Sequence, residues 1–300
     1  MIDPGEHPMV LGAMARMAGQ GAWARLLEGK PLEDPLDVND ARLLVAAGVL
    51  RRSADDVLEP VHMHPWHHDP DSLAGGALAH LRRALRHAEG YGAGWTADDL
   101  DIVRAQGQGS VAAAVALGEG LLPQMPAAHR AFLDGRARFL DVGVGIGAVA
   151  GRLCRMFPGT TAVGLDVLEP VLRVAEDELR EAGLDGLVEL RLQSVADLQD
   201  VECFDLAWLP QPFIARADLV AGLGGTFRAL RPDRWVVVPL AASRSGADDF
   251  ERALVEHGAH LTGGGTVTVC ELTGLLDAAG FVDVTSLETP DGMVVLARRP

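Results

Sequence analysis

The sequence predicts an α/β fold: a doubly wound, mostly parallel sheet, preceded by a mainly α-helical N-terminal region. Two observations concern the C-terminal half. From residue 139 onward, short apolar runs alternate with amphipathic helical stretches, which is typical of βαβ units. The first of these runs ends in an acid and a glycine-rich turn. The third observation is that helical periodicity dominates the residues before 136.

The glycine-rich turn is the most informative motif. Asp141 ends an apolar strand that starts at Phe139, and Gly143, Gly145 and Gly147 then open a helix over 148–157. Glycines in such a turn let the chain bend sharply and approach a ligand closely. The free N–H groups of the helix N-terminus would face an anionic or electron-rich group.

A second apolar strand, 161–166, supports a nucleotide-like ligand. It ends in Asp166, at the distance expected for a carboxylate that binds ribose hydroxyls. The pattern Gly143-x-Gly145-x-x-Ala148 also satisfies the dinucleotide fingerprint, so an NAD(P)-dependent oxidoreductase is an alternative.

The remaining C-terminal elements continue the alternation and end in a hairpin. Thr268 and Glu271 form a capping box, and Gly280 is expected to end the helix that follows. The predicted helices are 168–182, 215–230 and 270–279, and the predicted strands are 188–193, 204–209, 235–238, 281–284 and 293–296, with turns at 231–233 and 290–292.

The N-terminal elements are mainly helices. Pro31 and Pro35 are expected to break the first helix, Asn39 or Asp40 to cap the second, and the glycines of 107–110 to interrupt the last. The predicted helices are 9–27, 41–47, 73–86, 97–105 and a further one ending near 121, with a small hairpin formed by 49–52 and 57–61.

From about residue 139 to its end, the chain resembles a class I S-adenosylmethionine-dependent methyltransferase. The resemblance implies a Rossmann-like seven-stranded sheet closed by the C-terminal hairpin, with S-adenosyl-L-methionine as cofactor. It places Asp141 and the three glycines of the turn around the methionine part, and Asp166 on the ribose. Val167 and Leu168 would lie against the adenine.

Two positions depart from the family pattern. Ser194, with Val195 beside it, stands where the family often carries an acid near the adenine amine. Asp233-Arg234 replaces a common Gly-Gly pair before the fifth strand. The first departure leaves the adenine contact open, and the second predicts a different turn.

The N-terminal helix, turn and small hairpin resemble the winged-helix domain that precedes the catalytic domain in many small-molecule methyltransferases. There it serves dimerisation and covers the active site, so the resemblance implies a homodimer. DNA binding is the rival interpretation. The expected organisation is a dimerisation and lid domain over 1–105, linker helices over 106–135 and the catalytic domain over 136–300.

Several side chains are candidates for the methyl acceptor and for a catalytic base. The fold implied by the resemblance opens its acceptor pocket at the carboxyl ends of the fourth and fifth strands, which indicates Trp208, Gln211 and Phe213, with Trp208 also next to the cofactor. Trp66 lies in a histidine-rich segment that could close over an organic substrate. Candidate bases are His67, His68, His129, His257 and His260, and weaker cofactor candidates are Gln106, Gln108 and Ser110.

The histidines at 62, 64, 67 and 68 raise the question of a metal. They have no acid or cysteine at a recognisable ligand spacing, and we expect none to be bound.

Composition excludes several classes of protein. The 300 residues carry a net charge of −16, which argues against extended nucleic-acid binding. The three cysteines lie far apart, without a C-x-x-C pair, and the N-terminus lacks a signal-peptide pattern. No uninterrupted apolar run reaches membrane-spanning length. These features predict a cytoplasmic protein.

The sequence therefore predicts an S-adenosylmethionine-dependent methyltransferase that acts on a small molecule, by O-methylation in secondary metabolism. Peptide methylation, cyclisation on a methyltransferase fold and a non-enzymatic, cofactor-sensing dimeric regulator stay open beside the oxidoreductase. The acceptor and the atom that receives the methyl group cannot be read from this chain.

Overall fold

The computed structural model describes residues 8–47, 49–53, 57–60, 70–243, 246–289 and 292–300. The chain divides into two compact units. The first consists of Met1–Tyr91 and Asp101–Ala113, and the second of Gly92–Leu100 and Ala114–Pro300.

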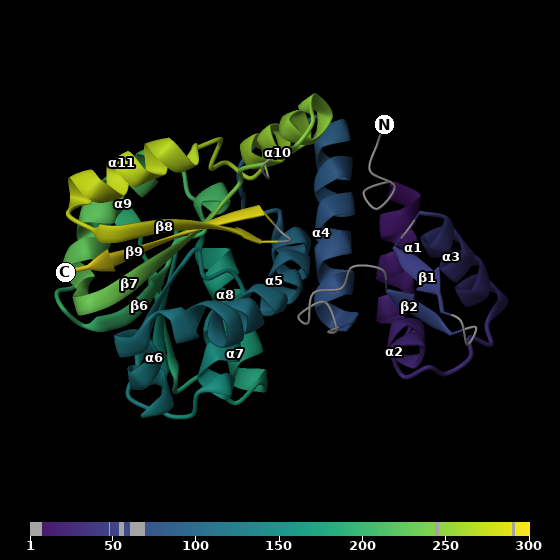
Figure 1. Cartoon of the computed structure of the whole chain (residues 1–300), viewed down its shortest axis with the longest axis horizontal. Helices are drawn as coiled ribbons and strands as arrows, with labels where there is room; N and C mark the ends of the chain where they lie inside the picture. The colour runs from purple at the N-terminus through teal and green to yellow at the C-terminus, as the bar shows by residue number, and fades with distance from the viewer. Residues whose placement is uncertain (1–7, 48, 54–56, 61–69, 244–245, 290–291) are drawn as a thin grey trace. The chain divides into compact units, whose positions relative to one another are not determined.

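The second unit is built on a seven-stranded sheet of order β5-β4-β3-β6-β7-β9-β8 (Figure 1). Strands β3 to β7 are parallel to one another, while β9 runs antiparallel to both β7 and β8. This arrangement confirms the predicted doubly wound sheet with its C-terminal hairpin. The strands are β3 (Arg138–Val142), β4 (Thr161–Asp166), β5 (Val188–Leu192), β6 (Phe204–Trp208), β7 (Leu230–Leu240), β8 (Val282–Thr289) and β9 (Gly292–Arg299).

Helices cover both faces of this sheet. Figure 1 shows α9 and α11 on one side, with α6 and α7 on the other. On the α9 and α11 side, Leu140, Ala207 and Val236 occupy one register across three strands and pack with leucines of both helices. The helices are α6 (Pro126–Leu133), α7 (Ala148–Met156), α8 (Glu169–Glu181), α9 (Arg216–Ala229), α10 (Asp249–Leu261) and α11 (Val269–Ala279), with short turns η3 (Ala116–Leu121), η4 (Leu122–Gln124), η5 (Val195–Asp197) and η6 (Gln211–Phe213).

The predicted ends of α11 are confirmed, while β7 is longer than predicted. Thr268 Oγ1 accepts a hydrogen bond from the Glu271 N–H at 3.1 Å, and Gly280 ends α11 with φ 101°. Strand β7 starts at Leu230, so the expected turn at 231–233 lies inside it. Leu230 pairs with β6 and Arg234 pairs with β9, and these two pairings hold the segment between them extended. Within it, Asp233 adopts a left-handed φ of 64°, which departs from regular strand geometry.

The first unit is mainly helical and carries a small antiparallel hairpin. Its core gathers apolar side chains of α1 and α3 around Trp23, which is fully buried. The elements are α1 (Pro8–Gly19), α2 (Ala22–Leu27), α3 (Pro35–Ala46), β1 (Leu50–Arg52), β2 (Leu58–Pro60) and α4 (Pro70–Ala88); α5 (Leu100–Val115) runs from the first unit into the second.

Three local predictions for the N-terminal helices were wrong. The expected helix over 9–27 is two helices, because the chain turns at Gly21 with φ 77°. Helix α3 starts at Pro35, where the Asp34 carboxylate accepts from the Leu36 N–H at 2.7 Å, and neither Asn39 nor Asp40 caps it.

The third concerns α5, which runs unbroken through 107–110. The glycines there allow close helix contact: a Cβ on Gly109 would lie 2.9 Å from the backbone nitrogen of Gly76 in α4.

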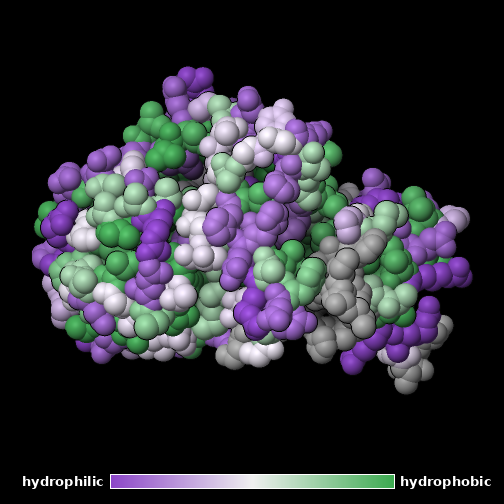
Figure 2. Space-filling model, turned by 90° about the horizontal axis from the view of Figure 1, so that it is seen from above, coloured by the Kyte–Doolittle hydropathy of each residue, from purple (hydrophilic) through white to green (hydrophobic). Residues whose placement is uncertain are grey.

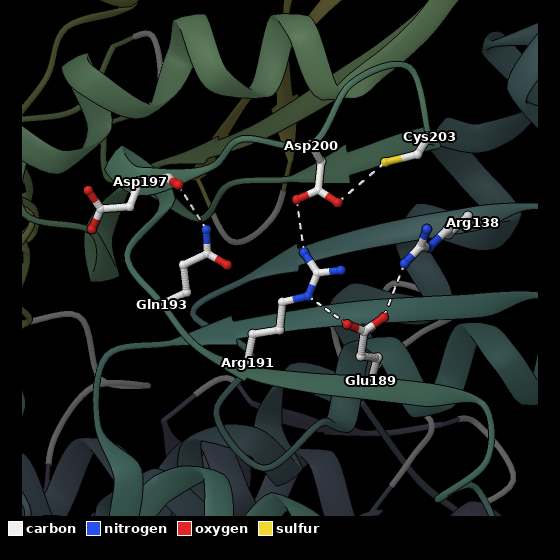
Figure 3. Close-up of polar contacts among 7 residues, drawn as sticks. All are labelled: Arg138, Glu189, Arg191, Gln193, Asp197, Asp200 and Cys203. Atoms are coloured by element: carbon white, nitrogen blue, oxygen red, sulfur yellow. Dashed lines mark hydrogen bonds and ion pairs between the residues drawn. The ribbon is translucent and has the colours of Figure 1, made fainter.

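An ion-pair network joins the edge strand β5 to the start of β3 and to the loop before β6 (Figure 3). Arg191 binds Glu189 at 2.7 Å and Asp200 at 2.8 Å, and Glu189 also binds Arg138 at 3.1 Å. Burial and the neighbouring Asp200 raise the pKa of the Cys203 thiol, which therefore stays neutral. The network links β5 to β3 and to the loop before β6, elements that are not all neighbours in the sheet.

The surface mixes residue types. In Figure 2 hydrophilic and hydrophobic residues are interspersed over the visible face. Large apolar side chains that are more than half exposed, such as Val167, Leu192 and Val201, belong to different loops and strand ends.

Candidate ligand site at the glycine turn

The turn between β3 and α7 has the geometry that its glycines predict. Gly143, Gly145 and Gly147 have φ values of 67°, 55° and 79°, which side chains with a Cβ rarely adopt. A Cβ on Gly143 would meet nothing within 4 Å, so the turn is open on that side. The N-cap residue of α7, Gly147, has no side chain to cap the helix, so the N–H groups of Ala148 and Val149 at its N-terminus have no side-chain acceptor among the hydrogen bonds that the structure shows.

Asp141 lies directly beneath the turn. Its side chain is buried, and its Oδ2 accepts from the Ala150 N–H of α7 at 3.1 Å. On the sheet it pairs with Gly164 of β4 and Trp208 of β6. Burial, with the negative charge of Asp166 as a smaller cause, raises the pKa of Asp141 from 3.8 to about 7.

Asp166 lies at the end of β4 and faces the same turn. Its two oxygens accept from the Leu168 N–H at 3.0 Å and from the Gly145 N–H at 3.2 Å. Burial raises the pKa of Asp166, and these backbone donors act in the opposite direction. Both strand-end acids of the sequence prediction are thus brought to one glycine turn.

The predicted adenine side lies at the ends of β4 and β5. Val167 is 61% exposed, and Leu192, which pairs with Asp166 on the sheet, is 59% exposed. Two such apolar side chains in water at neighbouring strand ends form a surface for a flat apolar group. Leu168, also predicted here, is half-buried and precedes the first turn of α8.

Ser194 and Val195 have local structural contacts. The Ser194 hydroxyl accepts from the Ala196 N–H at 3.1 Å and caps η5. Val195 is buried and lies against Gly222 of α9, where an added Cβ would come within 2.7 Å of it. The buried Val195 side chain is thus part of the core, while the Ser194 hydroxyl keeps its O–H donor.

One contact that shapes the turn has no motif in the sequence. Gly164 lies in the middle of β4, and a Cβ there would come within 2.5 Å of the Val144 side chain in the turn. The Val144 N–H also donates to the Leu165 carbonyl at 2.9 Å. Strand β4 therefore packs closely against the turn because residue 164 is a glycine. In the sequence this glycine looks like any other residue of the strand.

The segment after β6 was predicted to face a methyl acceptor. Trp208 is 8% exposed, next to Asp141 on the sheet. Gln211 is fully buried, and its Nε2 donates to the carbonyls of Gly264 at 3.1 Å and Gly265 at 2.8 Å. Gln211 thus ties η6 to the loop between α10 and α11.

Trp95, which sequence reasoning did not single out, contacts the segment predicted to face the acceptor. Its ring stacks edge-on against Phe213, with centroids 5.8 Å apart and planes at 75°. Its segment, 92–100, belongs to the second unit although residues on either side belong to the first. The Gly94 N–H bonds to the Leu261 carbonyl at 3.0 Å. Because these contacts join segments that are distant in sequence, no local pattern could show them.

The candidate bases are scattered over several elements. His129 is half-buried in α6, while His257 and His260 are exposed on α10. His260 Nδ1 lies 2.8 Å from the Glu256 carbonyl. None of the three has a contact with Asp141 or Asp166 among those that the structure shows for its described residues.

Other candidates lie outside this unit or outside the described residues. Gln106, Gln108 and Ser110 belong to the first unit, where the Ser110 hydroxyl donates to the Gln106 carbonyl at 2.8 Å. Trp66, His67 and His68 lie outside the described residues.

Neither a candidate metal site nor a candidate membrane-spanning helix occurs among the residues that the structure describes. Within them, no group of three His, Cys, Asp or Glu side chains could hold a metal ion. Among the helices that the structure describes, none is long and apolar enough to cross a membrane.

Comparisons with known proteins assign the central part of the second unit. Residues 139–233, which contain the glycine turn and both acids, match the family model "Methyltransferase domain". Methyltransferase GfsG of Streptomyces halstedii is 29% identical over 166 residues, 53% of this chain and 59% of that protein. Nocamycin O-methyltransferase of Saccharothrix syringae is 33% identical over 174 residues, 49% of this chain and 60% of that protein.

Another relative acts on a different kind of molecule, as its name states. A release factor glutamine methyltransferase of Gloeobacter violaceus is 30% identical over 141 residues, 46% of each chain. The chain spans about half to three fifths of the length of these curated relatives.

Solved structures resemble the chain over nearly its whole length. The pyocyanin biosynthetic protein PhzM has a TM-score of 0.62 at 20% identity, covering 97% of this chain and 95% of that one. The S-adenosylmethionine-dependent methyltransferase SibL, in its apo form, has a TM-score of 0.60 at 20% identity, covering 98% and 96%. At this identity the likeness concerns the fold, including its helical N-terminal region.

Fold, site and domain match together define the class. Residues 139–233 form a methyltransferase domain, and the sheet around them has the Rossmann-like topology of the class I enzymes. The match confirms the predicted methyltransferase domain, and the sheet topology confirms the predicted fold.

Proposed function

We propose that this protein transfers a methyl group from S-adenosylmethionine to an oxygen of a small organic molecule in secondary metabolism. The observation that carries the proposal is the convergence of Asp141, Asp166 and the open glycine turn within the methyltransferase domain. This donor set fits the cofactor. Asp166 offers carboxylate acceptors for ribose hydroxyls, and the turn leaves room for the methionine part.

The chain's own part in the reaction is positioning. The sulfonium of the bound cofactor supplies a methyl group that is already activated toward nucleophilic attack. Asp166 would hold the ribose, and the exposed Val167 and Leu192 would lie against the adenine. These contacts would orient the cofactor while the surrounding loops exclude water.

The acceptor side is proposed at the carboxyl ends of β6 and β7. Trp208, Phe213 and Trp95 place three aromatic side chains in the same unit, and Phe213 and Trp95 are in contact. Aromatic side chains bind flat apolar molecules through large contact areas. Gln211 acts on this side by holding the loop that carries Gly264.

Two relatives favour a small-molecule acceptor. Nocamycin O-methyltransferase is named for a small molecule and a methylated oxygen, and GfsG is a methyltransferase of a streptomycete. The release factor glutamine methyltransferases support a second candidate function, methylation of a glutamine side chain in a protein.

The proposal also assigns a role to the N-terminal unit and gives the domain boundaries and the candidate bases. The first unit, with helices α1 to α4 and the hairpin of β1 and β2, serves as a winged-helix-like dimerisation and lid domain of a cytoplasmic homodimer. The proposed boundaries are those of the sequence: 1–105, linker helices 106–135 and a catalytic domain 136–300. The base is proposed among His67, His68, His129 and His257.

The acceptor class can be tested with S-adenosylmethionine labelled in its methyl group. Incubation with a panel of phenols and other hydroxylated aromatic compounds should transfer label to an organic-extractable product. Replacing Phe213 by Ala should lower this transfer at least about tenfold and leave cofactor affinity within about 1 kcal/mol. Transfer only to a glutamine-containing peptide would favour the second function.

A further inference from the structure

Asp141 and Asp166 are two acids at one turn, and among the residues that the structure describes neither has a positively charged partner. All the contacts that the structure shows for them come from backbone N–H groups: Ala150 to Asp141, and Gly145 and Leu168 to Asp166. Elsewhere in this unit a buried acid is neutralised. Asp205 is equally buried, and both Arg231 and Arg234 bind it.

Among the described residues, none of the groups that shift the pKa of Asp141 is a cation; Arg152 and Arg155 of α7 are exposed. Asp166 faces it from β4, and Cys154 on α7 is the other titratable group in its electrostatic reach. Burial, and then Asp141, raise the pKa of Cys154 to about 11, so this thiol is neutral. Trp208 on β6 and Gly164 on β4, its sheet neighbours, carry no charge. Within the described part of the chain, the Ala150 N–H is thus the one group that favours the negative charge at Asp141.

We propose that Asp141 makes the site selective for a ligand with a positive charge, so that S-adenosylmethionine binds more tightly than its product S-adenosylhomocysteine. The inference rests on the proposed function. The two ligands share adenosine and the amino-acid group and differ by the methyl group and the sulfonium charge. A buried carboxylate without a cationic partner favours the charged ligand, because attraction between charges is strong away from water.

The proposal implies that cofactor binding is coupled to a proton. Burial raises the pKa of Asp141 to about 7, so the ligand-free protein holds a proton there for about half of the time at pH 7. A bound cation favours the ionised carboxylate and drives that proton off. S-adenosylmethionine affinity should therefore rise with pH, up to about tenfold per unit below pH 7 and less above it. The neutral sulfur of the product should give a weaker dependence.

Isothermal titration calorimetry of the full-length protein tests the coupling of ligand binding to proton release. Each ligand is titrated at pH 6.0 and at pH 8.0, and at each pH two buffers of different ionisation enthalpy give the number of protons released. At pH 6.0 the amino groups of both ligands are already protonated, so neither ligand takes up a proton there, and any loss from this shared group is the same for both ligands. We expect S-adenosylmethionine to release close to one proton at pH 6.0 and few at pH 8.0, with less release for S-adenosylhomocysteine at pH 6.0. If both ligands cause the same number of protons to be released, or if neither causes any release, the wild-type measurement alone overturns the proposal.

Two variants separate charge from structure. Asp141→Asn keeps an oxygen for the Ala150 N–H and removes the charge. At pH 8.0 it should weaken S-adenosylmethionine at least about fivefold more than S-adenosylhomocysteine and abolish proton release at pH 6.0. Asp166→Asn is the comparison variant: it should weaken both ligands, because both contain the ribose, and should change the ratio of the two affinities less than Asp141→Asn does.

The outcomes are distinguishable. If Asp141→Asn weakens both ligands equally, its carboxylate only supports the helix and the selectivity inference is wrong, while the proposed function stands. If the wild-type protein binds neither ligand, the proposed function fails and the inference with it.

Discussion

Gly264 lies at the most crowded glycine position of the acceptor side, and replacing it by Ala is a direct test of how that side is built. A Cβ at this position would lie 2.2 Å from the Gln211 carbonyl oxygen and 2.6 Å from the Pro212 carbonyl. Both atoms belong to the backbone of η6, so no side chain can rotate away. The loop between α10 and α11 must therefore move.

The magnitude follows from the contacts that this movement would break. The Gly264 N–H donates to the Pro212 carbonyl at 3.0 Å, and Gln211 Nε2 donates to the carbonyls of Gly264 and Gly265. A hydrogen bond contributes roughly 0.5–1.5 kcal/mol, and overpacking costs roughly 1–3 kcal/mol. With partial relaxation the loss should be about 2–5 kcal/mol, or at least about 4 °C in Tm for a unit of this size.

Thermal unfolding followed by circular dichroism measures this loss, with Gly274→Ala as the matched control. A Cβ on Gly274 in α11 would meet nothing within 4 Å, so that variant should gain about 0.5–1 kcal/mol from helix propensity. The binding of S-adenosylmethionine to Gly264→Ala should stay close to that of wild type. A Gly264→Ala protein with wild-type Tm would refute the packing described for this loop.

Three further predictions concern the sheet. Asp205→Asn should cost about 2–4 kcal/mol in urea unfolding, because Arg231 and Arg234 lose a buried counter-charge; an unchanged midpoint would contradict this. Asp233→Gly should cost less than about 0.5 kcal/mol and Asp233→Ala more than about 1 kcal/mol, because only glycine relieves φ 64°; equal losses would count against strain there. Without ligand, the stability of wild type relative to Asp141→Asn should fall by about 2 kcal/mol between pH 5 and 7.5.

The sign of that last effect follows from the proton on Asp141. Its pKa is about 7 in the folded protein against 3.8 in the unfolded chain, so the folded state binds the proton more tightly. The stabilisation is full below pH 4 and is lost as the pH rises through 7. A difference between the two proteins that does not change with pH, or that grows with pH, would contradict the burial assigned to this carboxylate.

The sheet could be predicted from the sequence because its strands are local signals. Parallel strands buried on both faces are continuous apolar runs, and each is followed by a turn or helix signal within a few residues. The strand-end acids Asp141 and Asp166 and the glycines between them form such a signal. Their positions in the structure are those that the motif requires.

The unpredicted features depend on contacts between distant residues. Glycines at 107 and 109 normally indicate a helix break, but α5 continues because Gly109 packs against the backbone of Gly76. Strand β7 extends back to Leu230 because Leu230 pairs with β6 and the residues from Arg234 onward pair with β9. These pairings keep the chain extended, although Pro232 favours a turn. The contact of Trp95 with Phe213 and the role of Gln211 likewise depend on the loop around Gly264, which no local pattern indicates.

The central claim is that the glycine turn with Asp141 and Asp166 binds S-adenosylmethionine. Calorimetric titration of the wild-type protein and of Asp166→Ala tests it most directly, with NADH as the comparison ligand. We predict that wild type binds S-adenosylmethionine and not NADH. Asp166→Ala should lose at least about tenfold in affinity, the equivalent of roughly 1.4 kcal/mol, because charged hydrogen bonds to the ribose are removed. Binding of NADH without binding of S-adenosylmethionine, or an unchanged affinity in Asp166→Ala, would contradict it.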